Sequence, residues 1–291
     1  IEFSKNEGMI TSWRLGNKNY IINGPKPNFW RPPTDNDFGN NMPVRLYVWK
    51  EASENRLVTD VRVSKRDNFI GIHIKVFYPS IDMEGEISYG IDGNGIILVT
   101  NSLDLQKSEL PNLPKFGMSM ALPKRFDNFT WYGRGPHESY SDRKSSAKID
   151  LFSGKVSDQY HPYIRPQENG NKTDVRWATF RDQNGYGLML SGYLSLKASH
   201  YTVDDYDTGV LIEDSGALKL QKENRHTIDM IEKNLVQLEI DHMQMGVGGE
   251  DSWGAQPMEE YQLKPRKYIY HFSMQLLEPT DKPSNIYKNS F

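Results

Sequence analysis

Cysteine is absent from the 291 residues of the chain. This absence excludes disulfide bonds, thiol catalysis and zinc sites built on cysteine. It does not fix the cellular compartment, because periplasmic and cytoplasmic proteins can both lack cysteine.

Long apolar runs and an excess of one charge are also missing. A membrane-spanning helix needs about 20 consecutive apolar residues, and no stretch approaches that length. The 35 basic and 38 acidic residues give a net charge of −3, which offers no electrostatic reason to expect nucleic acid or an anionic membrane as a partner. We therefore expect a soluble protein that binds neither.

The chain lacks an initiator methionine and a signal peptide, since it opens with Ile1-Glu2-Phe3-Ser4. This opening predicts a fragment of something longer.

Aromatic residues are plentiful, at 12% of the chain. They favour β-strands and supply flat faces on which sugar rings can stack. Alternation of apolar and polar residues predicts a strand over residues 69–77, where the sequence reads F-I-G-I-H-I-K-V-F. Further strands are predicted over residues 96–99, 188–190, 210–212, 235–240 and 268–277.

Helical patterns are few, and one helix is predicted over residues 44–54, with Val44, Tyr47, Val48 and Trp49 near one face. Short strands separated by frequent turns indicate a large all-β sandwich and not a βαβ sheet. We expect one domain over residues 1–280. The polar tail over residues 281–291 is expected to leave the core.

The first unusual loop covers residues 28–39, with the sequence N-F-W-R-P-P-T-D-N-D-F-G. Its prolines stiffen the backbone, and Asp35, Asn36 and Asp37 place three polar side chains together. One interpretation is a structural turn with self-capping side chains. The other is a hard-cation site with oxygen ligands, although the spacing is not that of an EF-hand.

The second loop, W-Y-G-R-G-P-H-E-S-Y-S-D-R over residues 131–143, concentrates charged residues beside aromatics. Arg134, His137 and Glu138 are candidates for hydrogen bonds to sugar hydroxyls. The alternative is an internal network in which Glu138 and Asp142 orient Arg134 and Arg143.

Just downstream, residues 160–170 read Y-H-P-Y-I-R-P-Q-E-N-G. This proline-pinned segment is either a preorganised polar surface or a rigid connection between sheets.

The third loop covers residues 243–254, with the sequence M-Q-M-G-V-G-G-E-D-S-W-G. Its glycines do not form a phosphate loop, because no G-K-[ST] follows. Trp253 is either a presented aromatic platform or a residue of the core.

Together these segments resemble the carboxy-terminal domain of glycoside hydrolase family 2 β-galactosidases. F-W-R-P-P-T-D-N-D-F-G is similar to the family's F-W-R-A-P-T-D-N-D, and residues 131–143 match its G-x-G-P-x-E-x-Y-x-D-R pattern. Residues 160–170 resemble Y-x-x-P-x-E-N-G. M-G-V-G-G-E-D-S-W resembles M-G-I-G-G-D-D-S-W, with Glu250 in place of the family's Asp. The opening residues I-E-F-S-K-N-E-G-M-I-T-S-W resemble the domain's first hairpin.

The resemblance implies a large two-sheet antiparallel supersandwich like that of galactose mutarotases. It also implies that Trp253 is the main substrate-binding residue, stacking on sugar at the mouth of an active site. Asp251, Arg134, His137 and Glu138 are secondary candidates for substrate binding.

The resemblance places the catalytic carboxylates on a TIM barrel outside this chain, so no catalytic or metal-binding residue is expected here. It implies that Mg²⁺ and Na⁺ belong to that barrel. It also implies galactosides or other oligosaccharides as ligands, the barrel and sandwich domains as partners, and a homo-oligomer. The bacterial periplasm and cytoplasm both remain open.

Two alternatives belong to other functional classes. One is a free-standing carbohydrate-binding module, which needs a complete sugar-binding face in these residues. The other is an aldose mutarotase, which needs a histidine and a carboxylate facing one sugar. Its candidates are His73, His137, His161 and His200.

Overall fold

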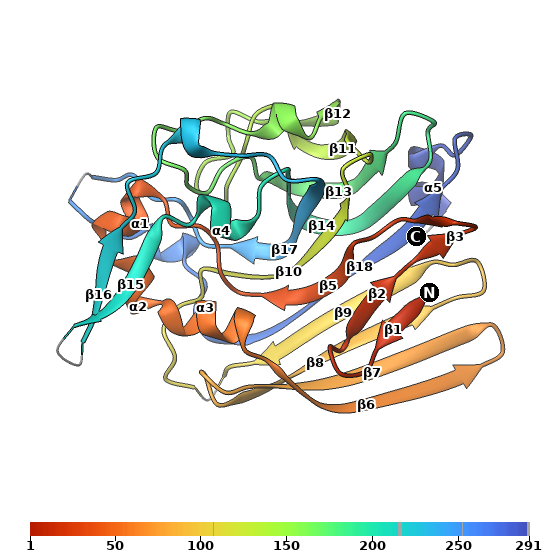
Figure 1. Cartoon of the computed structure of the whole chain (residues 1–291), viewed down its shortest axis with the longest axis horizontal. Helices are drawn as coiled ribbons and strands as arrows, with labels where there is room; N and C mark the ends of the chain where they lie inside the picture. Colours follow the sequence, from red (N-terminus) through yellow and green to blue (C-terminus); the bar gives the residue numbers. More distant parts are fainter. Residues whose placement is uncertain (107, 215–216, 252, 290–291) are drawn as a thin grey trace.

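The computed structural model describes residues 1–106, 108–214, 217–251 and 253–289. Nearly all of its regular structure is antiparallel β-sheet (Figure 1). The longest run of hydrogen-bonded neighbours has the order β12-β11-β13-β14-β18-β9-β8-β7-β6. These strands are β6 (Leu57–Arg66), β7 (Phe69–Tyr78), β8 (Met83–Ile91), β9 (Ile97–Asp104), β11 (Asn128–Gly135), β12 (Lys148–Lys155), β13 (Lys172–Arg181), β14 (Gly187–Ser199) and β18 (Lys267–Leu277).

The 13-residue strand β14 joins this run to a second limb of the sheet. Its first five residues, through Ser191, pair with β18, and its last five residues pair with β17 (Leu235–Gln244). Strand β17 then pairs with β10 (Lys115–Pro123), and β10 pairs with β5 (Asn23–Asn28). The expected all-β antiparallel architecture is confirmed, and its two layers are parts of one curled sheet.

One main hydrophobic core joins the two limbs. Val76 on β7, Met118 on β10 and Leu238 on β17 belong to the same buried cluster. Phe116 on β10 stacks on Tyr268 of β18, with ring centroids 5.0 Å apart. Burial of these side chains is the main force that curls the sheet.

The strand pattern over residues 69–77 is confirmed by β7. Ile72, Ile74 and Val76 are buried, whereas His73 and Lys75 between them are exposed. The alternation follows from the pleat, which points successive side chains to opposite faces. Four of the other five predicted strands fall within β14, β15, β17 and β18, and the one over residues 96–99 begins one residue before β9.

The predicted helix over residues 44–54 is wrong as a single element. The chain forms α2 (Met42–Arg45) and α3 (Tyr47–Glu54), separated at Leu46. The buried face of α3 consists of Trp49 and Ala52, because Trp49 packs edge-on against Phe29 of the core. Only Trp49 of the predicted face is buried.

The helices α1 to α3 gather with the β15–β16 hairpin at one end of the sheet (left in Figure 1). The remaining elements are β1 (Glu2–Ser4), β2 (Met9–Ser12), β3 (Arg14–Leu15), β4 (Lys18–Asn19), α1 (Asp35–Gly39), η1 (Ser157–Gln159), α4 (Val203–Tyr206), β15 (Gly209–Asp214), β16 (Ala217–Lys222), η2 (Thr227–Asp229), η3 (Glu259–Tyr261) and α5 (Pro283–Asn289). No helix in the described part of the chain is long and apolar enough to cross a membrane.

The polar tail forms α5 and is not loose. Ile286 and Tyr287 pack against a small cluster of Trp177, Met189 and Leu277, which is separate from the main core. Residues 290 and 291 of the predicted tail lie outside the described residues.

Candidate functional site

The loop that follows β17 presents Trp253 to solvent. The side chain of Trp253 is 90% exposed, although burying a large apolar side chain stabilises a fold by roughly 2–3 kcal/mol. Trp253 is therefore not a core residue, which removes one of the two interpretations of this loop. Three glycines, Gly248, Gly249 and Gly254, adopt positive φ angles of 70°, 107° and 100°.

Asp142, from the second loop motif, fixes the start of this loop. Its carboxylate accepts hydrogen bonds from the backbone N–H of Val247 at 3.0 Å and of Gly248 at 2.9 Å. A Cβ atom on Gly246 would lie 2.4 Å from Asp142 Oδ2. Glycine at position 246 is therefore required for the carboxylate to approach the backbone.

The first loop motif fixes the same segment from the other side. Arg31 is fully buried and donates hydrogen bonds to the backbone oxygens of Met245 at 2.7 Å and Gly246 at 3.0 Å. The same guanidinium forms an ion pair with Asp37 at 2.9 Å. Because this pair is buried and charge-assisted, its geometry is strongly constrained.

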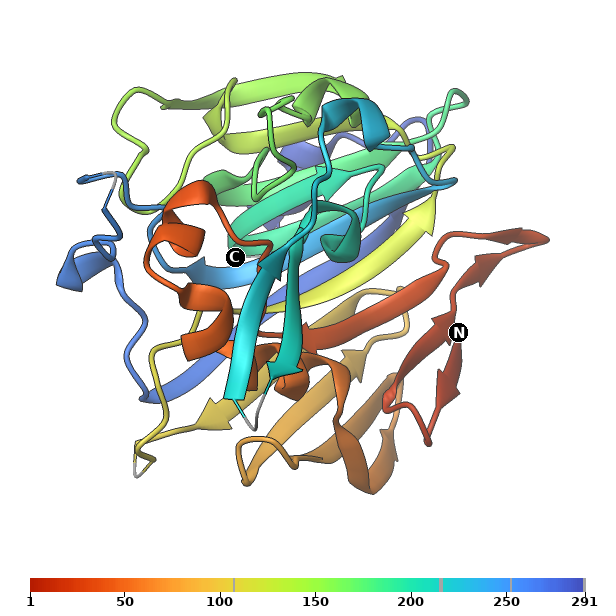
Figure 2. The same ribbon diagram turned by 60° about the vertical axis from the view of Figure 1, so that its left-hand side comes forward.

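Helix α1 lies against the tip of the loop. Asn36 Nδ2 donates to the backbone oxygen of Val247 at 3.1 Å. A Cβ atom on Gly254 would lie 2.5 Å from the backbone oxygen of Gly39, so the two backbones are in close contact. Figures 1 and 2 both show the segment after β17 projecting at the left edge beside α1.

Asp251 shapes the turn that carries the tryptophan. Its Oδ1 accepts hydrogen bonds from the backbone N–H of Trp253 at 2.9 Å and of Ala255 at 3.1 Å. These N–H groups lower the pKa of the Asp251 carboxyl below its usual value. In this structure Asp251 holds the turn, and its predicted contact with a substrate stays a prediction. Ser252 lies outside the described residues.

The D-N-D cluster is a helix start, as the structural interpretation predicts. Thr34 caps α1, with its side chain accepting from Asp37 N and the Asp37 carboxylate accepting from Thr34 N. The three side chains have separate partners, since Asp37 pairs with Arg31, Asn36 bonds to Val247 and Asp35 accepts from Gln167 Nε2. Across the described residues there is no group of three or more His, Asp or Glu arranged to hold a metal ion.

Arg134 is engaged by internal partners. Its guanidinium forms an ion pair with Asp174 and donates to the backbone oxygens of Lys144 at 3.1 Å and Ala147 at 2.7 Å. Arg134 therefore has internal partners, but its carboxylate is Asp174 on β13 and not the predicted Glu138 or Asp142.

Glu138 is also engaged internally. It pairs with Arg143, accepts from the Tyr163 hydroxyl and accepts from the backbone N–H of Gly170 at 2.7 Å. His137 lies beside it on the surface, with Nε2 3.0 Å from Ser146 Oγ. The structure thus places His137 in a position accessible to a ligand, while Arg134 and Glu138 already hold the loop together.

The segment over residues 160–170 connects elements and also reaches into the interior. Glu168 is buried, bonded to Lys197 Nζ at 3.1 Å and to the Tyr140 hydroxyl at 3.3 Å. Gln167 links the segment to Asp35 of α1. This supports its interpretation as a rigid connection.

The four histidines considered for a mutarotase do not share one site. His200 is buried, and its ring nitrogens face the backbone oxygen of Leu235 and the carboxylate of Asp127. His73 lies on β7, and His161 packs at a tilt against Tyr163 in the connecting segment. His200 thus pairs with a carboxylate, but its ring is buried and does not face a bound sugar.

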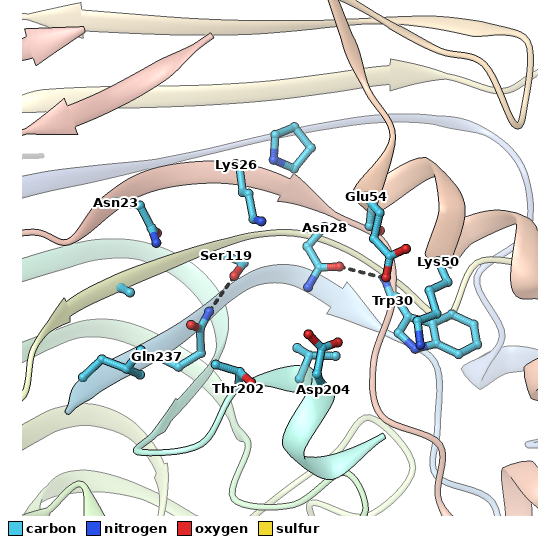
Figure 3. A pocket seen from close by; sticks show the side chains of 15 residues that line it. Asn23, Lys26, Asn28, Trp30, Lys50, Glu54, Ser119, Thr202, Asp204 and Gln237 are labelled. Atoms are coloured by element: carbon cyan, nitrogen blue, oxygen red, sulfur yellow. Dashed lines mark hydrogen bonds between the residues drawn. The ribbon is translucent and has the colours of Figure 1, made fainter. Parts of the chain in front are cut away.

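A polar cleft opens on the face of β5, β10 and β17 that is turned away from the core (Figure 3). It has a volume of about 310 Å³. Asn23, Lys26, Asn28, Ser119 and Gln237 contribute from the strands. Lys50 and Glu54 contribute from α3, whereas Thr202 and Asp204 come from the turn that begins α4. No sequence motif reveals this cleft, because its residues are scattered over residues 23–237.

Beyond the cleft, the same face continues as a buried charged network. Lys115 Nζ lies 2.6 Å from Glu239 and 3.2 Å from Asp241. Burial raises the pKa of Asp241 to about 7, against the opposing pull of Lys115. One lysine here faces two carboxylates.

Comparison with known proteins matches a family over almost the whole chain. A family profile described as "Beta galactosidase small chain" matches residues 1–276. A β-galactosidase of Priestia megaterium is 34% identical over 281 residues, which are 94% of this chain and 25% of that protein. A β-galactosidase of Halalkalibacterium halodurans is 31% identical over 268 residues, which are 90% of this chain and 25% of that protein. The chain spans about a quarter of the length of these curated relatives.

Among solved structures, a galactose mutarotase related enzyme from Lactobacillus acidophilus overlaps with a TM-score of 0.45 at 10% identity. The overlap covers 96% of this chain and 94% of that one.

Proposed function

Because the chain belongs to the β-galactosidase small-chain family, we propose that it is the carboxy-terminal domain of a β-galactosidase. In this proposal it completes the substrate site of a longer polypeptide, here called the parent, and does not cleave sugar itself. The relatives support a longer parent polypeptide, since the chain corresponds to only a quarter of each.

The observation that carries the proposal is the exposed Trp253 on a fixed loop. A flexible loop would lose conformational entropy on binding, whereas this one is already held by Asp142, Arg31 and α1. An indole ring offers a flat apolar face to the C–H groups of a sugar. Trp253 therefore supplies stacking for the bound galactoside, and His137, Asp251, Arg134 and Glu138 are secondary candidates.

Retaining hydrolysis of a β-galactoside needs an acid/base carboxyl and a nucleophilic carboxylate about 5–5.5 Å apart. Glu138 and Glu168 are the two glutamates of the segments over residues 131–143 and 160–170, and both already have internal partners. The catalytic pair is accordingly assigned to a TIM barrel in the parent, together with any Mg²⁺ or Na⁺ ion. The broad face of the sandwich packs on that barrel.

Hydrolysis of a chromogenic β-galactoside by this chain and by the parent tests the proposal. Turnover is expected only with the parent. Turnover by the 291-residue chain at a rate comparable to that of the parent would contradict the proposal. The variants Glu138→Gln and Glu168→Gln would then test whether these two carboxylates are catalytic.

A further inference from the structure

The polar face of β5, β10 and β17 is unusual for a sheet layer that is covered on both sides. On β10, Met118 and Met120 point into the core, while Ser119 points the other way. Ser119 lies opposite Lys26 on β5 and Glu239 on β17. Burying polar groups costs free energy unless each finds a partner, so this face is not explained by packing alone.

The cleft is the part of this face that stays open to a ligand. At the deep end, Lys115, Glu239, Lys197 and Glu168 satisfy one another. At the open end, the side chains of Asn23, Lys26 and Asp204 make no hydrogen bond within the part of the chain that the structure describes. Figure 3 shows Asn23, Lys26 and Asp204 around the same space.

The chemistry of the lining selects a neutral polyhydroxyl ligand. Lys26 and Lys50 line the cleft with Glu54 and Asp204, and Lys50 also pairs with Asp207 at 2.8 Å, so no excess of positive charge favours an anion. Amides and hydroxyls can donate or accept, as sugar hydroxyls require. Among those that line the cleft, the amide of Asn23 makes no hydrogen bond within the described part of the chain. The others already bond within the protein, namely Asn28, Ser53, Ser119, Thr202 and Gln237.

Apolar groups line the remaining wall, which suits the C–H face of a ring. They come from Pro27, Trp30, Val203 and Leu235. Trp30 is held in place, because its indole Nε1 donates to Asp207 Oδ2 at 2.9 Å. A cavity of about 310 Å³ lies at the small end of the roughly 300–1,000 Å³ typical of ligand pockets, so one sugar ring fits better than an extended oligosaccharide.

The cleft is also remote from the Trp253 loop along β17. Leu235 and Gln237 line the cleft at the first residues of the strand, and the loop leaves after Gln244 at its end. With a rise of about 3.3 Å per residue, Gln237 and Gln244 are roughly 23 Å apart. A single monosaccharide cannot contact both places.

We propose that this cleft between α3 and α4 is a binding site for one neutral sugar ring, complete within this chain and independent of Trp253. The proposal goes beyond the completion of a substrate site in the parent. It gives the chain an affinity for monosaccharide of its own.

The proposal is tested by titrating the 291-residue chain with D-galactose and detecting binding by saturation-transfer NMR. Saturable binding with a Kd in the millimolar range is expected, as for a small ligand held by a few hydrogen bonds. The double variant Asn23→Ala, Lys26→Ala should weaken binding at least fivefold. Both side chains lie at the open end of the cleft, so thermal melting should stay unchanged.

Two control variants separate binding in the cleft from binding elsewhere on the chain. Asn17→Ala removes an exposed amide on the turn between β3 and β4 and should leave Kd unchanged. Trp253→Ala should also leave Kd within twofold, whatever its effect on turnover by the parent. The absence of saturable binding, or binding lost in Trp253→Ala and kept in the double variant, would overturn the proposal without bearing on the proposed function.

Discussion

Asp142 holds the start of the loop that carries Trp253, the residue proposed to bind sugar. It lies in a motif rich in charged residues, and its partners are the two backbone N–H groups at the root of the Trp253 loop. The nearby Gly246 has no Cβ and so leaves room for the carboxylate. We interpret Asp142 as a positioning residue for Trp253.

Asp142→Ala is therefore expected to raise the KM of the parent for a galactoside, because the loop loses its anchor. The loss of two charge-assisted hydrogen bonds should also lower the free energy of unfolding by about 1–3 kcal/mol. Steady-state kinetics of the parent and urea unfolding of the chain measure the two effects.

Asp92→Ala is the matched control. Asp92 also accepts two backbone N–H groups, from Asn94 and Ile96, in a turn of another hairpin. It should cost similar stability and leave KM unchanged. If both variants changed KM equally, the effect would be one of general stability and the role given to Asp142 would be wrong.

At the scale of elements, the Trp253 loop and α1 act as one unit through the contact of Gly254 with Gly39. Both Gly254 and Gly95 have positive φ, at 100° and 81°, but only Gly254 faces a neighbouring backbone. No atom lies within 4 Å of a Cβ placed on Gly95. Substitutions at Gly95 and Gly254 therefore separate the effect of backbone strain from the effect of losing the contact with Gly39.

Gly95→Ala should cost only the strain of a left-handed alanine, about 1–2 kcal/mol. Gly254→Ala should cause similar strain and should also displace the loop from α1. The KM of the parent for a galactoside should therefore rise. Melting temperatures and KM values for both variants provide the measurement. Equal KM values for the two variants would show that the contact with α1 does not position Trp253.

Burial explains why the sequence predicted strand β7 and missed strand β10. Strand β7 has one exposed face, so its apolar residues alternate and reveal it. Strand β10 is buried on both faces along almost its whole length, which removes the alternation. Strand β5 contains two prolines and the sequence N-G-P-K-P-N, which is typical of a loop, yet it pairs only with β10 and so tolerates them as an edge strand.

The site was predictable where its residues are close in sequence and not where they are distant. The four motifs stand out because charged and aromatic residues crowd within each. The contact of Arg31 with Met245 joins residues 214 positions apart, and the partner of Arg134 is Asp174 on another strand. No local spacing encodes such pairs, because only the pairing of the strands brings them together.

At the scale of the whole molecule, the buried network gives stability a dependence on pH. Burial raises the pKa of Asp241 to about 7. The folded chain therefore holds the proton of Asp241 more tightly than the unfolded chain does. Its stability falls as pH rises from about 4 to about 7, and Asp241 causes no further loss of stability above about pH 7.

Asp241→Asn should abolish this contribution, which is on the order of a few kcal/mol. The decrease in the free energy of unfolding between about pH 5 and about pH 8 should therefore be smaller in the variant. Urea unfolding at the two pH values measures it.

Asp150→Asn is the control, since Lys148 lowers the pKa of that exposed carboxyl. The contribution of Asp150 to stability changes with pH only below this range. Asp150→Asn should therefore show the same pH dependence of unfolding as the wild type. An unchanged pH dependence in Asp241→Asn would contradict the assignment.

The central claim, that the chain presents Trp253 to a sugar bound by the parent, is tested most directly by Trp253→Ala in the parent. Ile228→Ala is the matched control, since the two side chains are 90% and 89% exposed. We expect Trp253→Ala to raise KM about tenfold, or about 1.4 kcal/mol, with an unchanged melting temperature, while Ile228→Ala changes neither. An unchanged KM together with a lowered melting temperature in Trp253→Ala would contradict the account.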